Sequence, residues 1–240
     1  MKNHIVIIAL LLFISGGTAQ NTNLDYKNAF KVYNLTTFEQ YSKYRGDTTA
    51  YSFRNTTTLL QILHPTIAFQ WKTKKYNFHE IELTNFMLSK TGTKTEIVND
   101  TTGSGQMVNG NDLIATLISA RYEYIFNFNK SKDKKLVPSL GFSINPYFRQ
   151  NNYIPKISTS FKTVERYFGA TTFIIPRLTY YLSSKLFIDV NIPLCFSDIY
   201  RLTDKDENPA IPARQQTITN YNFELFPKIF SGRLGVGLKL

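Results

Sequence analysis

The side chains best suited to acid–base or nucleophilic chemistry are few in this chain of 240 residues. An acyl hydrolase needs a general base, most often a histidine, beside a serine or an acid. Beyond its first 19 residues the chain offers only His64 and His79. One interpretation is therefore an acyl hydrolase that uses His64 with a distant serine and glutamate. The other is that both histidines occupy ordinary structural positions.

The remaining motifs that carry chemistry are weak. The single cysteine, Cys195, excludes an intrachain disulfide framework and any multi-cysteine zinc or iron–sulfur site. Glycines 103, 105 and 110 lie in a polar stretch and lack the strand-to-helix context of a phosphate-binding loop. We therefore predict no catalytic, cofactor-binding or metal-binding residues and no cofactor.

Charged side chains instead recur at alternate positions of apolar segments. In residues 114–128 the even positions carry no charge, whereas the odd positions include Arg121 and Glu123. A period of two indicates a β-strand whose two faces meet different surroundings. The strand is also long, because these residues would extend roughly 50 Å at about 3.3 Å each. Strands in globular proteins commonly have about 5–6 residues.

Similar alternation predicts most of the other strands. Clear patterns cover residues 136–148, 168–182, 186–196 and 233–240. Weaker patterns cover 59–72 and 76–88, and a first strand at 26–35 completes the count.

The first 19 residues are typical of a secretory signal peptide. A ten-residue apolar run at 5–14 is too short to span a membrane as a helix, which takes about 20 residues. Small residues at Gly17 and Ala19 predict cleavage before Gln20. No later apolar stretch approaches 18 residues, so two classes remain. These are a soluble exported β protein and a β-barrel of an outer membrane.

The connections between the predicted strands favour the barrel. Short connections at 73–75, 129–135 and 183–185 alternate with long ones at 36–55, 89–112, 151–166 and 197–222. Transmembrane barrels show this alternation, with short periplasmic turns and long extracellular loops. We predict an all-β fold for residues 20–240, an antiparallel up-and-down transmembrane β-barrel. It has eight strands, or ten if residues 217–226 form a separate strand.

Two further sets of residues fit this interpretation. Aromatic residues beside the short turns are candidates for an interfacial girdle, namely Trp71, Tyr76, Phe126, Phe128 and Tyr180. The alternation also places charged residues inside the barrel, namely Glu80, Glu82, Arg121, Glu123, Arg149, Arg177 and Asp189. The interior of an eight-stranded barrel is just filled by side chains. We therefore predict an ionic plug without an open pore; a proton or substrate site inside the barrel is the alternative.

The predicted signal peptide, the long alternating strands and the terminal segment Ser231-Gly-Arg-Leu-Gly-Val-Gly-Leu-Lys-Leu240 resemble small outer-membrane β-barrel proteins of Gram-negative bacteria. The abundance of Tyr, Asn and Lys resembles those of the Bacteroidota. The resemblance implies the outer membrane as location and the barrel-assembly machinery as a partner during biogenesis. It implies no functional residue.

The expected function is a pore-less outer-membrane barrel with a structural or interaction role, whose long extracellular loops carry recognition. The alternatives are a lipid-modifying barrel enzyme that hydrolyses acyl chains of lipid A or phospholipid, and a small transport or secretion-accessory barrel. A soluble lipocalin-like carrier disagrees with the charged interior.

The formal net charge of +11 could indicate nucleic-acid binding in a soluble protein. An exported chain seldom meets nucleic acid, so we expect none. The basic residues at the short turns are Lys72, Lys74, Lys75, Lys130, Lys132, Lys134 and Lys135. We expect outer-membrane lipids, lipopolysaccharide and phospholipid, as partners. Plain solvated turns are the alternative for the lysines.

Overall fold

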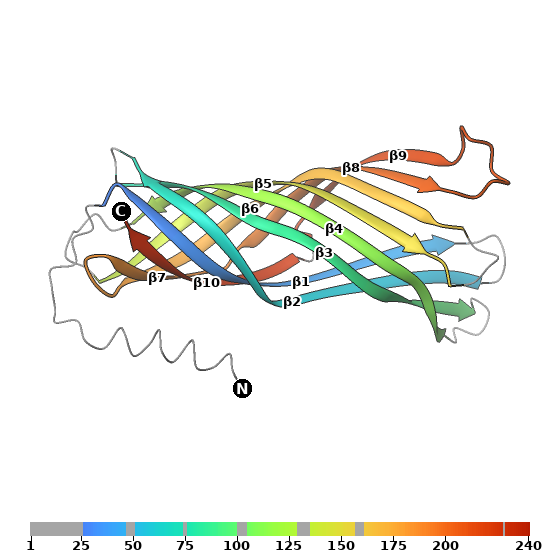
Figure 1. Ribbon diagram of the computed structural model, residues 1–240, viewed down its shortest axis with the longest axis horizontal. Coiled ribbons are helices and arrows are strands. Elements are labelled where there is room, and N and C mark those ends of the chain that lie inside the picture. The colour runs from blue at the N-terminus through green and yellow to red at the C-terminus, as the bar shows by residue number, and fades with distance from the viewer. Residues whose placement is uncertain are drawn as a thin grey trace.

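The computed structural model describes residues 26–46, 51–73, 76–99, 105–128, 135–156, 161–227 and 229–240. The strands are β1 (Asn28–Gly46), β2 (Tyr51–Lys72), β3 (Phe78–Asn99), β4 (Gly105–Asn127), β5 (Leu136–Ile154), β6 (Thr163–Tyr181), β7 (Leu186–Asn191), β8 (Leu194–Asp206), β9 (Thr217–Leu225) and β10 (Ile229–Lys239). All pairings are antiparallel, and β1 pairs with both β2 and β10, which closes the sheet into a barrel (Figure 1). The predicted signal peptide, residues 1–19, lies outside the described residues.

The ten strand segments make eight barrel strands, because two of these are interrupted. Ile192 and Pro193 separate β7 from β8, and both segments pair with β6. Phe226, with a φ of 52°, and Pro227 separate β9 from β10. Proline has no N–H to donate, so it disrupts the ladder at such points. The prediction of eight strands is confirmed, and residues 217–225 form the first part of the last strand.

One end of the barrel, here called the terminal end, is where β1 begins and β10 ends; the opposite end is the far end (Figure 1). At the far end the prediction of long loops is wrong, because strands continue through most of these segments. The β1–β2 ladder runs from Asn28 to Gly46, and β8 and β9 pair as far as Lys205 and Thr217. These strand ends are rich in polar residues, which weakens the alternation in the sequence, although their backbone pairing continues.

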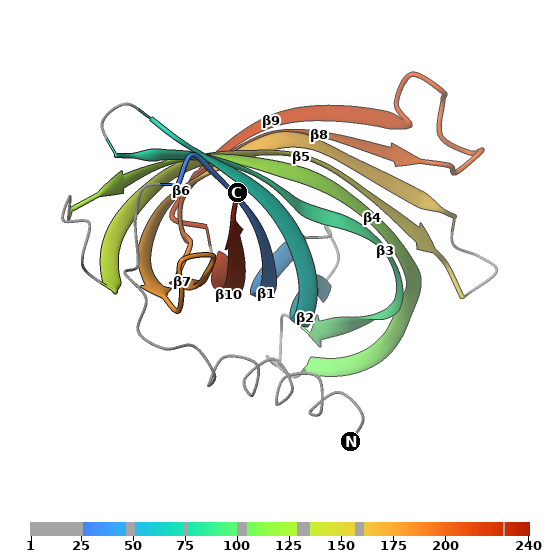
Figure 2. The same ribbon diagram turned by 60° about the vertical axis from the view of Figure 1, so that its left-hand side comes forward.

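The seam between the first and last strands is paired over only part of its length. Hydrogen-bonded pairs join β1 to β10 from Ala29–Lys239 to Glu39–Ile229. Beyond that point, β9 pairs with β8 alone among the described elements. Figure 2 shows the β8–β9 hairpin standing away from the far half of β1.

The outer wall carries an apolar belt on the half nearer the terminal end. Its side chains have exposed fractions of 42–58% and include Phe30, Val32, Ile67, Phe69, Ile81, Leu83, Ile118, Phe142, Ile144, Leu178, Val190, Ile192, Leu194, Leu234 and Leu238. Monomeric soluble proteins rarely expose a continuous apolar surface of this kind. Among the described residues, no helix is both long and apolar enough to cross a membrane.

Aromatic rings gather on this wall beside the terminal-end turns. Trp71 stacks on His79 at 5.3 Å between ring centroids, and Phe126 meets Phe128 at 5.6 Å. The Lys72 ammonium lies 4.2 Å from the ring centroid of Tyr76. These rings therefore occupy the edge of the apolar belt.

Inside the barrel, the terminal end is closed by an aromatic cap. The cap is formed by Tyr26, Ala29, Phe78, Ile125, Val137, Tyr181 and Phe187. Two glycines of β10 make room for large neighbours. A Cβ atom on Gly237 would lie 2.1 Å from Phe187 Cζ, and one on Gly235 would lie 2.2 Å from Tyr33 Cδ1.

Gly237→Ala is therefore expected to lower the free energy of unfolding by about 1–3 kcal/mol, the usual cost of overpacking. Phe187 is fully buried and has no room to withdraw. Gly232→Ala is the matched control, since a Cβ atom there has no neighbour within 4 Å. This control should be neutral or slightly stabilising, because alanine loses less backbone entropy than glycine on folding. Equal urea midpoints for the two variants would contradict the argument.

Candidate functional site

Above the aromatic cap, eight charged side chains form an ionic layer across the lumen. They are Lys31, Glu80, Glu82, Arg121, Glu123, Arg177, Asp189 and Arg233, and each is at most 4% exposed. They sit at inward positions of β1, β3, β4, β6, β7 and β10, as the two-residue period of a strand requires. Four cations face four anions, so the layer is formally neutral.

One half of the layer is centred on Arg177. Its guanidinium lies 2.6 Å from Glu123, 3.1 Å from Glu80 and 2.5 Å from Asp189. The Lys31 ammonium bridges Glu80 at 2.7 Å and Asp189 at 2.8 Å. The Tyr33 hydroxyl accepts a hydrogen bond from Arg177 at 2.6 Å and lies 2.9 Å from Asp189.

The other half is centred on Glu82. It accepts hydrogen bonds from Arg121 at 2.5 Å and from Thr66 at 2.5 Å, and it also pairs with Arg233. Arg233 reaches Glu123 at 3.2 Å, which connects the two halves. Buried charges persist only when paired and hydrogen-bonded. These side chains are almost inaccessible to solvent and contact one another across the lumen at this level.

The sequence predicted most of this layer. Six of its eight residues were expected inside, namely Glu80, Glu82, Arg121, Glu123, Arg177 and Asp189, and the structure brings them together. Arg149 also faces the lumen, but it lies nearer the far end, where it lines a cavity. Lys31, Tyr33 and Arg233 were not singled out. Lys31 alternates with the outward Phe30 and Val32, so its position in the strand pattern was a usable signal.

The two histidines and the cysteine each contact neighbouring residues of the barrel wall. His64 Nε2 lies 3.0 Å from the main-chain oxygen of Thr84, so this nitrogen carries the hydrogen and donates it. His79 Nδ1 meets the Tyr122 hydroxyl at 2.7 Å on the outer wall. Cys195 is buried inside the barrel and packs with Phe173 and Ile175. Within the described ranges, no group of three or more His, Cys, Asp or Glu residues could hold a metal ion.

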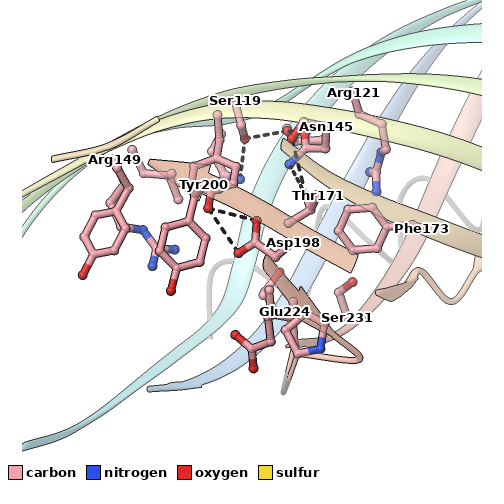
Figure 3. A pocket seen from close by; sticks show the side chains of 18 of the residues that line it. Ser119, Arg121, Asn145, Arg149, Thr171, Phe173, Asp198, Tyr200, Glu224 and Ser231 are labelled. Carbon is pink, nitrogen blue, oxygen red and sulfur yellow. Dashed lines mark hydrogen bonds between the residues drawn. The ribbon is translucent and has the colours of Figure 1, made fainter. Parts of the chain in front are cut away.

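On the far side of the ionic layer lies a cavity of about 340 Å³, shown in Figure 3. Its apolar lining consists of Leu35, Leu117, Phe173, Leu202, Pro227 and Ile229. Its charged and tyrosine lining consists of Arg121, Tyr147, Arg149, Tyr167, Asp198, Tyr200 and Glu224. The volume is in the range of small-molecule sites. This cavity is the candidate binding site, and nothing in the strand pattern predicted it.

Hydrogen bonds hold the polar lining in place. The Tyr147 hydroxyl donates a hydrogen bond to the Asp198 carboxylate, at 3.0 Å from Oδ1 and 3.1 Å from Oδ2. Asp198 is 8% exposed. The rings of Tyr167 and Tyr200 approach to 5.6 Å at an angle of 50°. On the opposite side, Thr84 bonds to Ser119 at 2.7 Å and to Asn145 at 2.8 Å.

Comparison with known proteins finds a solved structure with a similar fold but identifies no family for this chain. No family model matches the chain, and no curated protein sequence matches it significantly. Among solved structures, it is similar to the outer membrane protein OprG from Pseudomonas aeruginosa. The TM-score is 0.54 at 8% sequence identity, and the match covers 92% of this chain and 99% of that one. The chain is a closed eight-stranded antiparallel β-barrel, a fold it shares with this outer membrane protein.

Proposed function

We propose that the chain is an outer-membrane β-barrel protein of a Gram-negative bacterium, with no open axial pore and with an interaction or binding role at its far end. The observation that carries the proposal is the neutral ionic layer, which fills the lumen between the aromatic cap and the cavity. A diffusion pore needs a water-filled lumen. In this chain charged side chains occupy the lumen instead of water. We therefore place any recognition at the far end.

The outer wall supports the membrane setting. On β5, outward positions run from Pro138 through Phe142 and Ile144 to Phe148 without a charge. Ten residues rise about 33 Å along a strand, and a tilt near 40° reduces this to about 25 Å, the height of the apolar band of such barrels. Residues 138–148 would therefore cross the hydrocarbon core, with the far parts of the strands outside it.

The partners follow from this setting. The apolar belt would contact the acyl chains of phospholipid and lipopolysaccharide, and the barrel-assembly machinery would insert the chain after export through its N-terminal signal. Of the seven lysines expected near headgroups, Lys72 and Lys135 lie at terminal-end turns, and the other five lie outside the described residues. We assign these lysines to anionic headgroups at the inner surface.

Two measurements test the proposal. The protein should fractionate with the outer membrane and show a heat-modifiable shift on gels, whereas a purely soluble periplasmic protein would refute it. Proteoliposomes containing the full-length mature protein should swell in sugar or amino-acid solutions no faster than protein-free liposomes. Swelling at the rate of a general porin would show that the lumen is open.

A further inference from the structure

The far half of the outer wall carries a patch of basic residues. Arg166 of β6 and Arg201 and Lys205 of β8 are exposed and point outward. Their direction follows from the alternation of the two strands, because Tyr167 and Tyr200, next to the two arginines, line the internal cavity. We call these three basic residues the outer basic patch.

The three cations of the patch are close neighbours on the sheet surface. Arg166 pairs directly with Thr203, so Arg201 and Lys205 are both its diagonal neighbours across the β6–β8 ladder. Diagonal neighbours lie about 7–8 Å apart, within reach of long side chains. Like charges repel one another at this spacing. An anion bound between them removes that repulsion and contacts cations from both strands.

The described residues around the patch carry no carboxylate on the outward face of β5, β6, β8 and β9. The acidic residues of these strands, such as Glu165 and Asp204, occupy inward positions of the same alternation. Glu207, which follows the end of β8, pairs with Lys162 at 3.7 Å. The outward surface is therefore positive here, and it is separated from the acidic residues by the sheet itself.

An aromatic row separates the patch from the apolar belt. Phe148 pairs directly with Phe168, and Arg201 pairs directly with both Phe168 and Tyr221. The row thus crosses four neighbouring strands of the wall, β5, β6, β8 and β9 (Figure 1). Phe168 is 70% exposed and Tyr221 is 78% exposed. The patch therefore begins where the proposed membrane-crossing part of β5, residues 138–148, ends.

The side chains of the patch suit a phosphorylated headgroup. The guanidinium groups of Arg166 and Arg201 can each hold a phosphate by two parallel hydrogen bonds, and Lys205 adds a further positive charge. Neutral donors and acceptors at the surrounding outward positions suit sugar hydroxyls, namely Gln150, Asn152, Thr203, Thr217 and Thr219. A free phosphate ion has no use for the aromatic row, whereas a lipid lays its acyl chains there and on the belt.

From these observations we propose that the outer basic patch binds the phosphorylated sugar headgroup of a glycolipid of the lipid A class. The phosphates lie between Arg166, Arg201 and Lys205, and the acyl chains pass the aromatic row and rest on the apolar belt. The inference rests on the proposed function, which places the far end at the outer surface of the membrane. Binding in detergent is measured separately from membrane fractionation and liposome swelling, so failure of this site is distinguishable from failure of the proposed function.

The test measures lipid binding by native mass spectrometry of the full-length mature protein, released from a maltoside detergent. The probes are lipid A, dephosphorylated lipid A with the same sugars and acyl chains, and phosphatidylglycerol. Lipid A is expected to bind at least about tenfold more tightly than either of the others, because each basic residue near an anionic headgroup strengthens binding about fivefold. Inorganic phosphate at millimolar concentration should not displace it. Equal binding of the two forms of lipid A, tighter binding of phosphatidylglycerol, or displacement by inorganic phosphate would overturn the proposal.

A triple variant locates the site. It replaces all three cations of the patch by glutamine, namely Arg166→Gln, Arg201→Gln and Lys205→Gln. Lipid A binding should weaken roughly a hundredfold, as a loss of about fivefold for each charge implies.

The control variant removes the same charge from exposed lysines outside the patch, namely Lys27→Gln, Lys90→Gln and Lys185→Gln. Lys27 precedes β1 and Lys185 precedes β7 at the terminal end, and Lys90 lies on β3, three strands away from β6. Its affinity should stay within about twofold of the parent, because salt screens charges this far from the patch. Equal losses in the two triple variants would show that binding follows net charge alone and would overturn the assignment.

Arg201 gives an independent check. Arg201→Lys keeps the positive charge but loses the two-pronged contact with phosphate, so it should lose binding severalfold. Arg201→Gln should lose more, because the charge is gone as well. If Arg201→Gln bound lipid A as tightly as the parent, the proposed contact would be wrong. The heat-modifiable gel shift confirms that each variant is folded before titration.

Discussion

Replacing Arg177 by methionine is expected to lower the free energy of unfolding by about 3–5 kcal/mol, the cost of leaving buried charges without their partner. Arg177 contacts Glu80, Glu123 and Asp189, all of which are almost completely buried. Without it the ionic layer carries one excess negative charge that no water can reach. The change is measurable as a lower urea midpoint in the fluorescence of the single tryptophan, Trp71.

Two companion variants separate loss of charge balance from loss of packing. Arg166→Met removes an arginine whose contact with Gln150 is exposed, and it should change stability by less than about 1 kcal/mol. Arg177→Met combined with Asp189→Asn restores neutrality, so its cost should be smaller than the sum of the two single costs by about 1–3 kcal/mol. Strict additivity would mean that the layer does not act as one network.

Introducing arginine at Ile144 on the outer wall is expected to cost about 2–4 kcal/mol, the penalty for this side chain at mid-membrane in a β-barrel. Ile144 is 46% exposed and lies near the middle of the proposed membrane-crossing part of β5. The cost arises because lipid cannot solvate the guanidinium. In a water-soluble barrel the same exposed position would accept arginine readily.

Ile154→Arg is the matched control for this prediction. Ile154 lies on the same strand and the same face, ten residues nearer the far end, and is 39% exposed. It should cost only about 0–1 kcal/mol, because it lies outside the hydrocarbon core. Both variants would be compared by refolding into lipid vesicles and urea titration. Equal costs at the two positions would refute the membrane setting of the belt.

The sequence predicted the barrel well where lipid and lumen differ most. In residues 114–128 the outward side must be apolar and the inward side can be charged, so Arg121 and Glu123 mark the inner face without ambiguity. The same reasoning placed Glu80, Glu82, Arg177 and Asp189 correctly. A strand shows a period of two in its sequence because its two faces meet different surroundings.

Where the two faces of a strand do not differ in this way, the sequence did not predict the strand. The far parts of β1, β3 and β8 are rich in polar residues, so the sequence predicts loops there, although their ladders continue. Residues 217–225 do alternate, with Tyr221, Phe223 and Leu225 exposed on one face, and they were ambiguous because a separate strand there would have raised the strand count to ten. The cavity could not be foreseen, because its shape depends on how side chains from seven of the eight barrel strands meet. The pairing of Asp198 with Glu224 depends on register, which no local pattern specifies.

The closing seam has a consequence for folding. Lys31 and Arg233 lie on the first and last strands to be synthesised, and both need carboxylates from the strands between them. If β10 docked one residue out of register with β1, every side chain of β10 would change faces and Arg233 would enter the lipid. A slip of two residues would move it roughly 7 Å along the strand from its partners. The ionic layer therefore favours the correct pairing of β1 with β10, because its charges are balanced by their partners only when the barrel closes in that register.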